Sequence, residues 1–254
     1  MTQLSRYRAS FFIALFFIAG IAQATTTANS DTIAKQLAQR YHISIFFYYV
    51  PALSWRIQYL HADPSDEKTL QTYMMRFNQA FSCYTPLLIK KIQLKGVIIL
   101  KYVRLNDQPR AAIPDYHQEY LIYDFIQGFG NATYQKHVIH HEIYHMLEEA
   151  IHGNGYYYDP TWAHFNSPNF RYGSGGASMQ AGHLSIFNHP ALGFVNHYAM
   201  SGLEEDKAEI FAALMVPEER QQLANWIKQG DYVLKQKRDY MRAFIQSLDP
   251  NMRI

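Results

Sequence analysis

The segment HEIYHMLEEAIHGNG, at residues 141–155, has the spacing of an amphipathic helix. Apolar side chains recur in it and just before it at intervals of four, three and four residues. These positions are Ile139, Ile143, Met146 and Ala150. The pattern predicts a helix with one buried side, and the glycines at 153 and 155 predict that it ends there.

The first five residues of that segment form a candidate metal-binding motif. In a helix, His141 and His145 lie one turn apart and about 40° around the axis. Both imidazoles can therefore bind one Zn²⁺ ion at roughly 2.0–2.1 Å. Glu142 projects about 100° from His141, where its carboxylate can take a proton from a metal-bound water. The alternative is that three polar residues lie on a solvated helix face.

A catalytic zinc ion needs a third protein ligand and an open position. His152 does not fit the pattern HExxHxxGxxH, which would place the third histidine at Ile151 and a glycine at Glu148. The better candidate is Glu205, which lies four residues before Glu209 on one face of a second predicted helix. We expect Glu205 to bind the metal. We expect Glu209 to hydrogen-bond one of the ligand histidines without touching the metal itself. A solvated acidic face is the alternative.

The start of the second helix is indicated by a capping pattern. Ser201 and Glu204 match the S-x-x-E capping box, just before the apolar residues Ile210, Phe211 and Leu214. This match gives Glu204 a structural role at the helix start. The ligand on this helix is therefore expected to be Glu205.

The rest of the chain predicts an α+β fold. In the first half we expect helices over 31–41 and from Asp63-Pro64 to Phe81. Strands are predicted over 43–50, 97–105 and 119–124, with a polar turn segment between the last two. Pro217 and Gly230 separate two further helices. The prediction is one domain over residues 25–254, with a small mixed sheet (31–125) followed by a mainly helical half (131–254).

Residues 1–24 have the features of a secretory signal peptide. Arg6 and Arg8 precede a twelve-residue apolar run, and an A-x-A cleavage pattern ends at Ala24. An uncleaved membrane anchor is the alternative, but twelve residues fall short of the roughly 20 that span a bilayer. We expect an exported protein, periplasmic or secreted after cleavage near Ala24, with no stable membrane anchor.

Composition excludes several classes of protein. The chain has 254 residues, of which 48% are hydrophobic and 17% charged, so it can bury a large core. A single cysteine, Cys83, excludes a disulfide scaffold, and we expect this residue to be buried. The formal charge of +2 falls to zero without Arg6 and Arg8. No nucleic-acid partner is therefore expected.

The motif residues resemble those of a known family. HEIYH followed by YAMSGLEEDKAE resembles the gluzincin metallopeptidases of the zinc-binding peptidase group, which are distantly similar to the lethal factor toxin catalytic domain. Members share Tyr-x6-Glu-x3-Glu after HExxH, and Tyr198, Glu205 and Glu209 match it. Residues 162–173 and 193–198 are similar to two further motifs of the group, with one inserted residue in the first and asparagine for serine in the second.

This resemblance implies a zincin-like metallopeptidase domain that acts on a polypeptide substrate. It assigns zinc binding to His141, His145 and Glu205, the general base to Glu142 and oxyanion stabilisation to Tyr198. It also implies that residues 119–124 form a cleft edge where an extended peptide can pair by strand addition. The alternative function is a secreted binding protein with a structural or vestigial zinc site.

An aromatic stretch fills the long interval between the two halves of the motif. Residues 153–196 include Tyr156, Trp162, Phe170 and Tyr172. One interpretation is that these rings shape the substrate cleft. The other is that they form an additional core beneath a surface loop.

Overall fold

The computed structural model describes residues 29–54, 56–176 and 186–254, so the predicted signal peptide lies outside the described residues. The strands are β1 (Ser44–Phe46), β2 (Ile57–Leu60), β3 (Gly96–Leu105), β4 (Gln108–Pro109), β5 (Ala112–Asp115) and β6 (Tyr120–Asp124). The helices are α1 (Ser30–Tyr41), α2 (Glu67–Phe81), α3 (Pro86–Lys91), α4 (Ala132–His152), α5 (Pro160–Phe165), α6 (Leu203–Met215), α7 (Pro217–Lys228) and α8 (Tyr232–Leu248), with 3₁₀ turns η1 (Pro64–Asp66) and η4 (Tyr198–Met200).

The first half forms a mixed sheet with strand order β1-β3-β6-β5. β1 and β6 run parallel to β3, whereas β5 runs antiparallel to β6, and β2 and β4 pair with β3. Successive residues of β3 point to opposite faces, as a strand requires. Val97 and Ile99 belong to the main core with the helices, and Ile98 and Leu100 to a smaller core on the other face.

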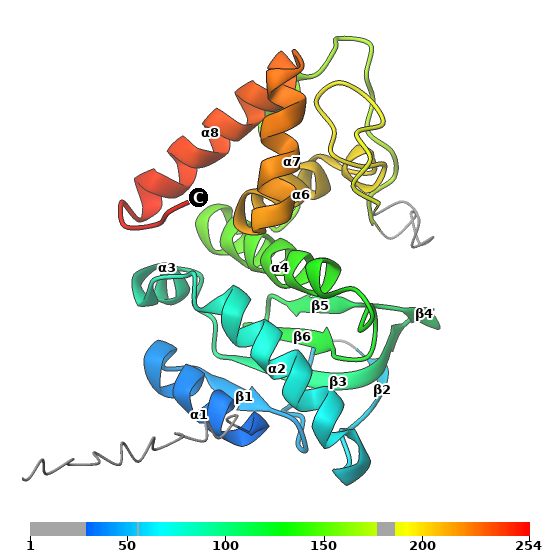
Figure 1. The fold of residues 1–254 in the computed structure, drawn as a ribbon, viewed down its shortest axis with the longest axis vertical. Helices are drawn as coiled ribbons and strands as arrows, with labels where there is room; N and C mark the ends of the chain where they lie inside the picture. Colours follow the sequence, from blue (N-terminus) through cyan, green and yellow to red (C-terminus); the bar gives the residue numbers. More distant parts are fainter. Residues whose placement is uncertain (1–28, 55, 177–185) are drawn as a thin grey trace, which may run out of the picture.

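α4 occupies the centre of the molecule, between the sheet with α2 and the α6–α8 helices (Figure 1). The side chain of Asn131 caps its first turn by accepting from Tyr134 N–H, and Gly153 ends it with φ 66°, a conformation that favours glycine. Ile139 and Ile143 are fully buried, as the spacing predicts. The predicted α+β fold, a mixed sheet followed by a helical half that carries the motif helix, is confirmed.

Three local predictions are wrong. The strand expected over 43–50 is only β1, and the turn expected between the last two strands contains β4 and β5. Their prolines at 109 and 114 hide the strand pattern, since proline is confined to sheet edges. Cys83 is exposed because α2 ends at Phe81, before the helical spacing can bring the thiol inward.

The predicted capping box at α6 is also wrong. The helix begins after Gly202, and no side chain caps its N-terminus. The Ser201 hydroxyl instead donates to the carbonyl oxygen of Tyr198 at 2.7 Å, within the η4 turn. Glu204 therefore does not have the capping role that the sequence pattern predicts.

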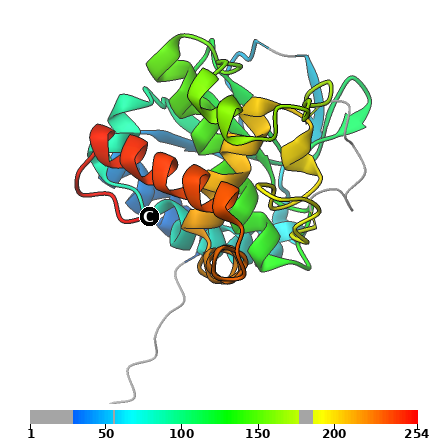
Figure 2. The ribbon, with the colours of Figure 1, turned by 90° about the horizontal axis from the view of Figure 1, so that it is seen from above.

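A buried aspartate joins the start of α6 to the rest of the helical half. Asp206 accepts hydrogen bonds from Trp162 Nε1 at 2.8 Å, Tyr172 Oη at 2.6 Å and Lys237 Nζ at 2.6 Å. Lys237 also donates to the Gly193 carbonyl oxygen at 2.7 Å. These bonds link α6 to α5, to the aromatic stretch and to α8, which lies across the top of the helices (Figure 2).

Several rings of the aromatic stretch belong to the core or pack against it. Trp162 is fully buried, and Phe170 and Tyr172 pack against the main core beside Phe194. This arrangement supports the core interpretation for these three residues. Within the described residues, none of the helices combines the length and the apolar composition needed to span a bilayer.

Replacing Lys237 by methionine should lower the free energy of unfolding by about 3–5 kcal/mol, because Asp206 would remain buried without its cation. Both side chains of this pair are 0% exposed. Lys235→Met is the matched control on the same helix, since the Lys235–Asp239 pair is 59% and 45% exposed and should contribute less than about 1 kcal/mol. Urea unfolding measures both values, and equal losses would contradict a structural role for the buried pair.

Candidate metal centre

Two elements bring together three side chains that can bind one metal ion. α4 supplies His141 and His145, and the first turn of α6 supplies Glu205. The two Nε2 atoms are 3.0 Å apart, and Glu205 Oε2 lies 3.0 Å from that of His141 and 3.4 Å from that of His145. All three residues are buried. The structure thus places the three predicted ligands in one group.

The group fits a zinc ion in both spacing and chemistry. Four ligands arranged tetrahedrally at zinc–ligand distances of 2.0–2.2 Å lie roughly 3.3–3.6 Å from one another, close to the separations seen here. Glu205 Oε2 is buried and faces the Nε2 atoms of both histidines, as expected of three atoms that share one metal ion. Among these residues the group has three members, which leaves a fourth position for another ligand.

The orientation of His141 is fixed by a row of buried polar groups. Its Nδ1 lies 2.9 Å from Glu209 Oε1, as predicted for a residue that supports a ligand histidine. The other oxygen of Glu209 is 2.9 Å from His137 Nε2 and accepts from Asn196 Nδ2 at 2.6 Å. His137 Nδ1 is in turn 2.6 Å from Glu219 Oε2. The sequence analysis missed His137, Asn196 and Glu219, although His137 precedes His141 by one helical turn.

His137, His141 and Glu209 form a second group of close side chains, but both ring nitrogens of His137 face a carboxylate. Burial alone would lower the pKa of His137, but Glu209 and Glu219 outweigh it and hold that pKa well above its usual value. A protonated imidazole donates from both nitrogens and has no lone pair for a metal. His137 therefore belongs to the support of Glu209.

Glu142 and Tyr198 lie beside the three ligands and line the same cavity. Glu142 Oε2 has no hydrogen-bond partner in the described part of the chain; burial raises the pKa of this carboxyl, and His141 and His145 oppose the shift. Burial also raises the pKa of the Tyr198 phenol, and the nearby Glu205 adds to the effect. The phenol therefore keeps its proton and can donate a hydrogen bond.

A glycine that the sequence analysis missed completes the wall of the site. Gly176 is buried, and a Cβ there would overlap Glu205 Oε1 and Tyr198 Oη. Only glycine lets the backbone approach both side chains so closely. The repeated glycines at 175 and 176 were the available signal.

The cavity beside the ligands has a volume of about 190 Å³ and lies between α4 and β5. It is lined by Leu105, Arg110, Ala112, Ile113, Pro114, Tyr116, His141, Glu142, His145, Tyr156, Tyr198 and Glu205. The prediction that residues 119–124 form the cleft edge is wrong, because β6 lies between β3 and β5. Residues 121–124 are buried on both faces, as an interior strand requires, and β5 is the edge strand on this side of the sheet.

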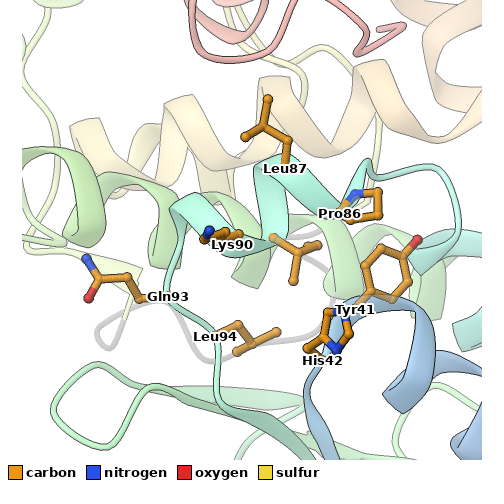
Figure 3. Close-up of a pocket in the computed structure, with 8 residues that line it drawn as sticks. Tyr41, His42, Pro86, Leu87, Lys90, Gln93 and Leu94 are labelled. Atoms are coloured by element: carbon orange, nitrogen blue, oxygen red, sulfur yellow. The ribbon is translucent and has the colours of Figure 1, made fainter.

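A second cavity, of about 500 Å³, lies between the end of α1 and α3 (Figure 3). Its lining includes Tyr41, His42, Leu87 and Lys90 and shares no residue with the metal centre. It contains no carboxylate, so it does not offer the ligand set found on α4 and α6.

Glu209→Gln should weaken zinc binding by about 10- to 100-fold, because His141 would lose the carboxylate that orients its ring. Glu204→Gln is the matched control, since Glu204 lies on the same helix outside both His/Glu groups. Competition with a chelator measures the two dissociation constants. Equal affinity of Glu209→Gln and the wild-type protein would contradict the orienting role.

Comparison with known proteins supports the α+β fold described above. No family model matches the chain, and no curated protein matches it. A crystal structure at 2.10 Å of a "putative zinc-binding metallo-peptidase" from Bacteroides caccae ATCC 43185 matches with a TM-score of 0.57 and 15% identity, over 86% of this chain and 84% of that one. The chain thus shares the α+β fold of that structure and carries a buried His/Glu group that suits a zinc ion.

Proposed function

We propose that the protein is a zinc-dependent metallopeptidase that hydrolyses peptide bonds. The observation that carries the proposal is the convergence of His141, His145 and Glu205 at 3.0–3.4 Å, at the wall of a cavity that Glu142 also lines. The shared fold with a structure described as a zinc-binding metallo-peptidase supports it.

The chemistry divides between the metal and the side chains around it. A zinc ion held by the three ligands would lower the pKa of a bound water and polarise the substrate carbonyl. Glu142 Oε2, which has no hydrogen-bond partner among the described residues, takes the proton of the attacking water and passes it to the leaving amine. The Tyr198 phenol donates a hydrogen bond to the carbonyl oxygen as negative charge develops on it.

The edge of the sheet supplies a place for an extended polypeptide. Asp124 N–H donates to the Ala111 carbonyl oxygen at 2.9 Å, so Ala111 faces β6. The backbone N–H and C=O groups of successive strand residues point to alternate sides. Those of Ala112 therefore point to the outer edge of the sheet, and those of Ile113 point inward to β6. An extended substrate can pair with Ala112 by strand addition. The exposed ring of Tyr156, at the cavity rim, can contact a substrate side chain.

The alternative, a binding protein with a structural zinc site, requires a closed set of four protein ligands. Among the described residues the group has three members beside a cavity that Glu142 lines, which favours the enzyme. A protein that binds one zinc ion and cleaves no member of a peptide library would favour the alternative.

We also propose that the protein is exported, on the strength of residues 1–24. Cleavage after Ala24 predicts that the protein recovered from the periplasm or the medium begins at Thr25, as N-terminal sequencing would show. Recovery with an intact N-terminus in the membrane fraction would contradict this proposal.

Glu142→Gln should keep one bound zinc ion per chain and lose turnover by at least about 10²- to 10⁴-fold, because the amide cannot accept the water proton. Zinc content and cleavage of an unstructured polypeptide are measured on the same preparation. Glu149→Gln is the control, since Glu149 lies on α4 outside the cavity and should leave turnover nearly unchanged. Cleavage by Glu142→Gln at the wild-type rate would contradict the mechanism.

A further inference from the structure

Arg110 places a positive charge in the wall of the cavity, next to the start of β5. Its backbone N–H donates to the Val103 carbonyl oxygen at 2.9 Å, which fixes the residue at the sheet edge. The side chain lines the cavity together with Glu142 and Tyr156. Among the lining residues it is the one arginine, and none is a lysine.

The guanidinium of Arg110 is only partly used by the protein. Nη2 donates to Gln108 Oε1 at 3.1 Å, whereas Nε is buried and has no hydrogen-bond partner in the described part of the chain. Arg76 shows the contrast, because its Nη1 donates at 2.7 Å both to the Phe129 carbonyl oxygen and to Gln135 Oε1. Arg76 thus holds two segments together, whereas Arg110 makes one side-chain hydrogen bond to the described residues.

The charge of Arg110 reaches the reacting end of the cavity. Its side chain lines the same cavity as His141, Glu142 and His145. No acidic side chain in the described residues lies within ion-pair distance of Arg110, so Glu142 does not neutralise it. An arginine that lacks a protein carboxylate in the wall of this cavity suits a carboxylate of the ligand, which it can bind through two parallel hydrogen bonds.

We propose that Arg110 is a specificity-determining residue that binds a carboxylate of the polypeptide substrate. This inference rests on the proposed peptidase function and names the substrate class. The carboxylate belongs either to an acidic side chain or to the C-terminus of the substrate. Arg110 lies just before β5, and antiparallel pairing with β5 brings the C-terminal part of an extended segment towards that end of the strand.

The test uses matched peptide substrates. One set carries glutamate or glutamine at successive positions of a peptide with an amidated C-terminus, and the other compares free and amidated C-termini on one neutral peptide. The wild-type protein should prefer one carboxylate form by at least about tenfold in kcat/KM, as expected for a charge-assisted hydrogen bond. The first set identifies an acidic side chain as the ligand, and the second identifies the chain end.

Variants assign the preference to Arg110. Arg110→Gln should reduce the preference to about one, and Arg110→Lys should keep part of it, because lysine retains the charge but not the paired donors. Arg104→Gln is the matched control: Arg104 lies on the same hairpin, donates to the Asp107 carbonyl oxygen and is outside the cavity lining. It should keep the full preference.

A binding measurement makes the test independent of hydrolysis. In the Glu142→Gln background, calorimetry should show at least about tenfold tighter binding of the preferred carboxylate peptide, lost on adding Arg110→Gln. Equal affinity for charged and neutral peptides, or a preference that survives Arg110→Gln, would overturn the inference. Cleavage without a carboxylate preference would leave the peptidase function standing, whereas no cleavage by the zinc-loaded protein would count against that function.

Discussion

A single buried carboxylate, that of Glu209, sets how α6 packs on α4. One of its oxygens faces His141 Nδ1 and the other faces His137 Nε2, both at 2.9 Å. An ionised carboxylate buried without partners would be strongly destabilising, so α6 can pack only where both histidines meet it. In that register Glu205, one turn earlier, comes to face the Nε2 atoms of His141 and His145.

The residues after Glu205 hold the first turn of α6 from two other directions. Asp206 points away from the metal centre and pairs with Lys237 of α8 in a fully buried site. Lys207 pairs with Glu148 of α4 and donates to the Tyr157 carbonyl oxygen at 2.9 Å. Asp206 and Lys207 thus anchor the turn to α8 and to α4. Such anchoring limits the movement of Glu205. A side chain that binds a metal ion must be held in place in this way.

The sequence predicts the parts of the site that helical geometry controls. His141 and His145, and Glu205 and Glu209, are each four residues apart, so a helix converts their spacing directly into a common face. The two pairs come together only when one helix packs on the other, and helical spacing alone does not predict this packing. It was expected from the requirement for a third ligand and from the family resemblance.

The missed features depend on contacts between distant segments. Glu219 meets His137 only because α7 packs against α6 and so brings its first turn to α4. Arg110 reaches the cavity only because β5, which follows it, forms an edge of the sheet. The prediction of a capping box at Ser201 is wrong for a related reason. The Ser201 hydroxyl donates to the Tyr198 carbonyl oxygen in the preceding turn and does not cap the helix. Local sequence patterns predict on which face of a helix or strand a residue lies. The packing of distant segments decides which of these residues come into contact.

Pro114 gives the edge of the sheet a further property. In β5 its ring nitrogen lies at the outer edge, where any other residue would present an amide hydrogen. Two copies of the chain therefore cannot pair their β5 strands along the full length. At Pro114 each strand lacks the N–H that a backbone carbonyl of the other strand would need. The proline therefore limits how far this edge can extend into a sheet shared between two copies of the chain.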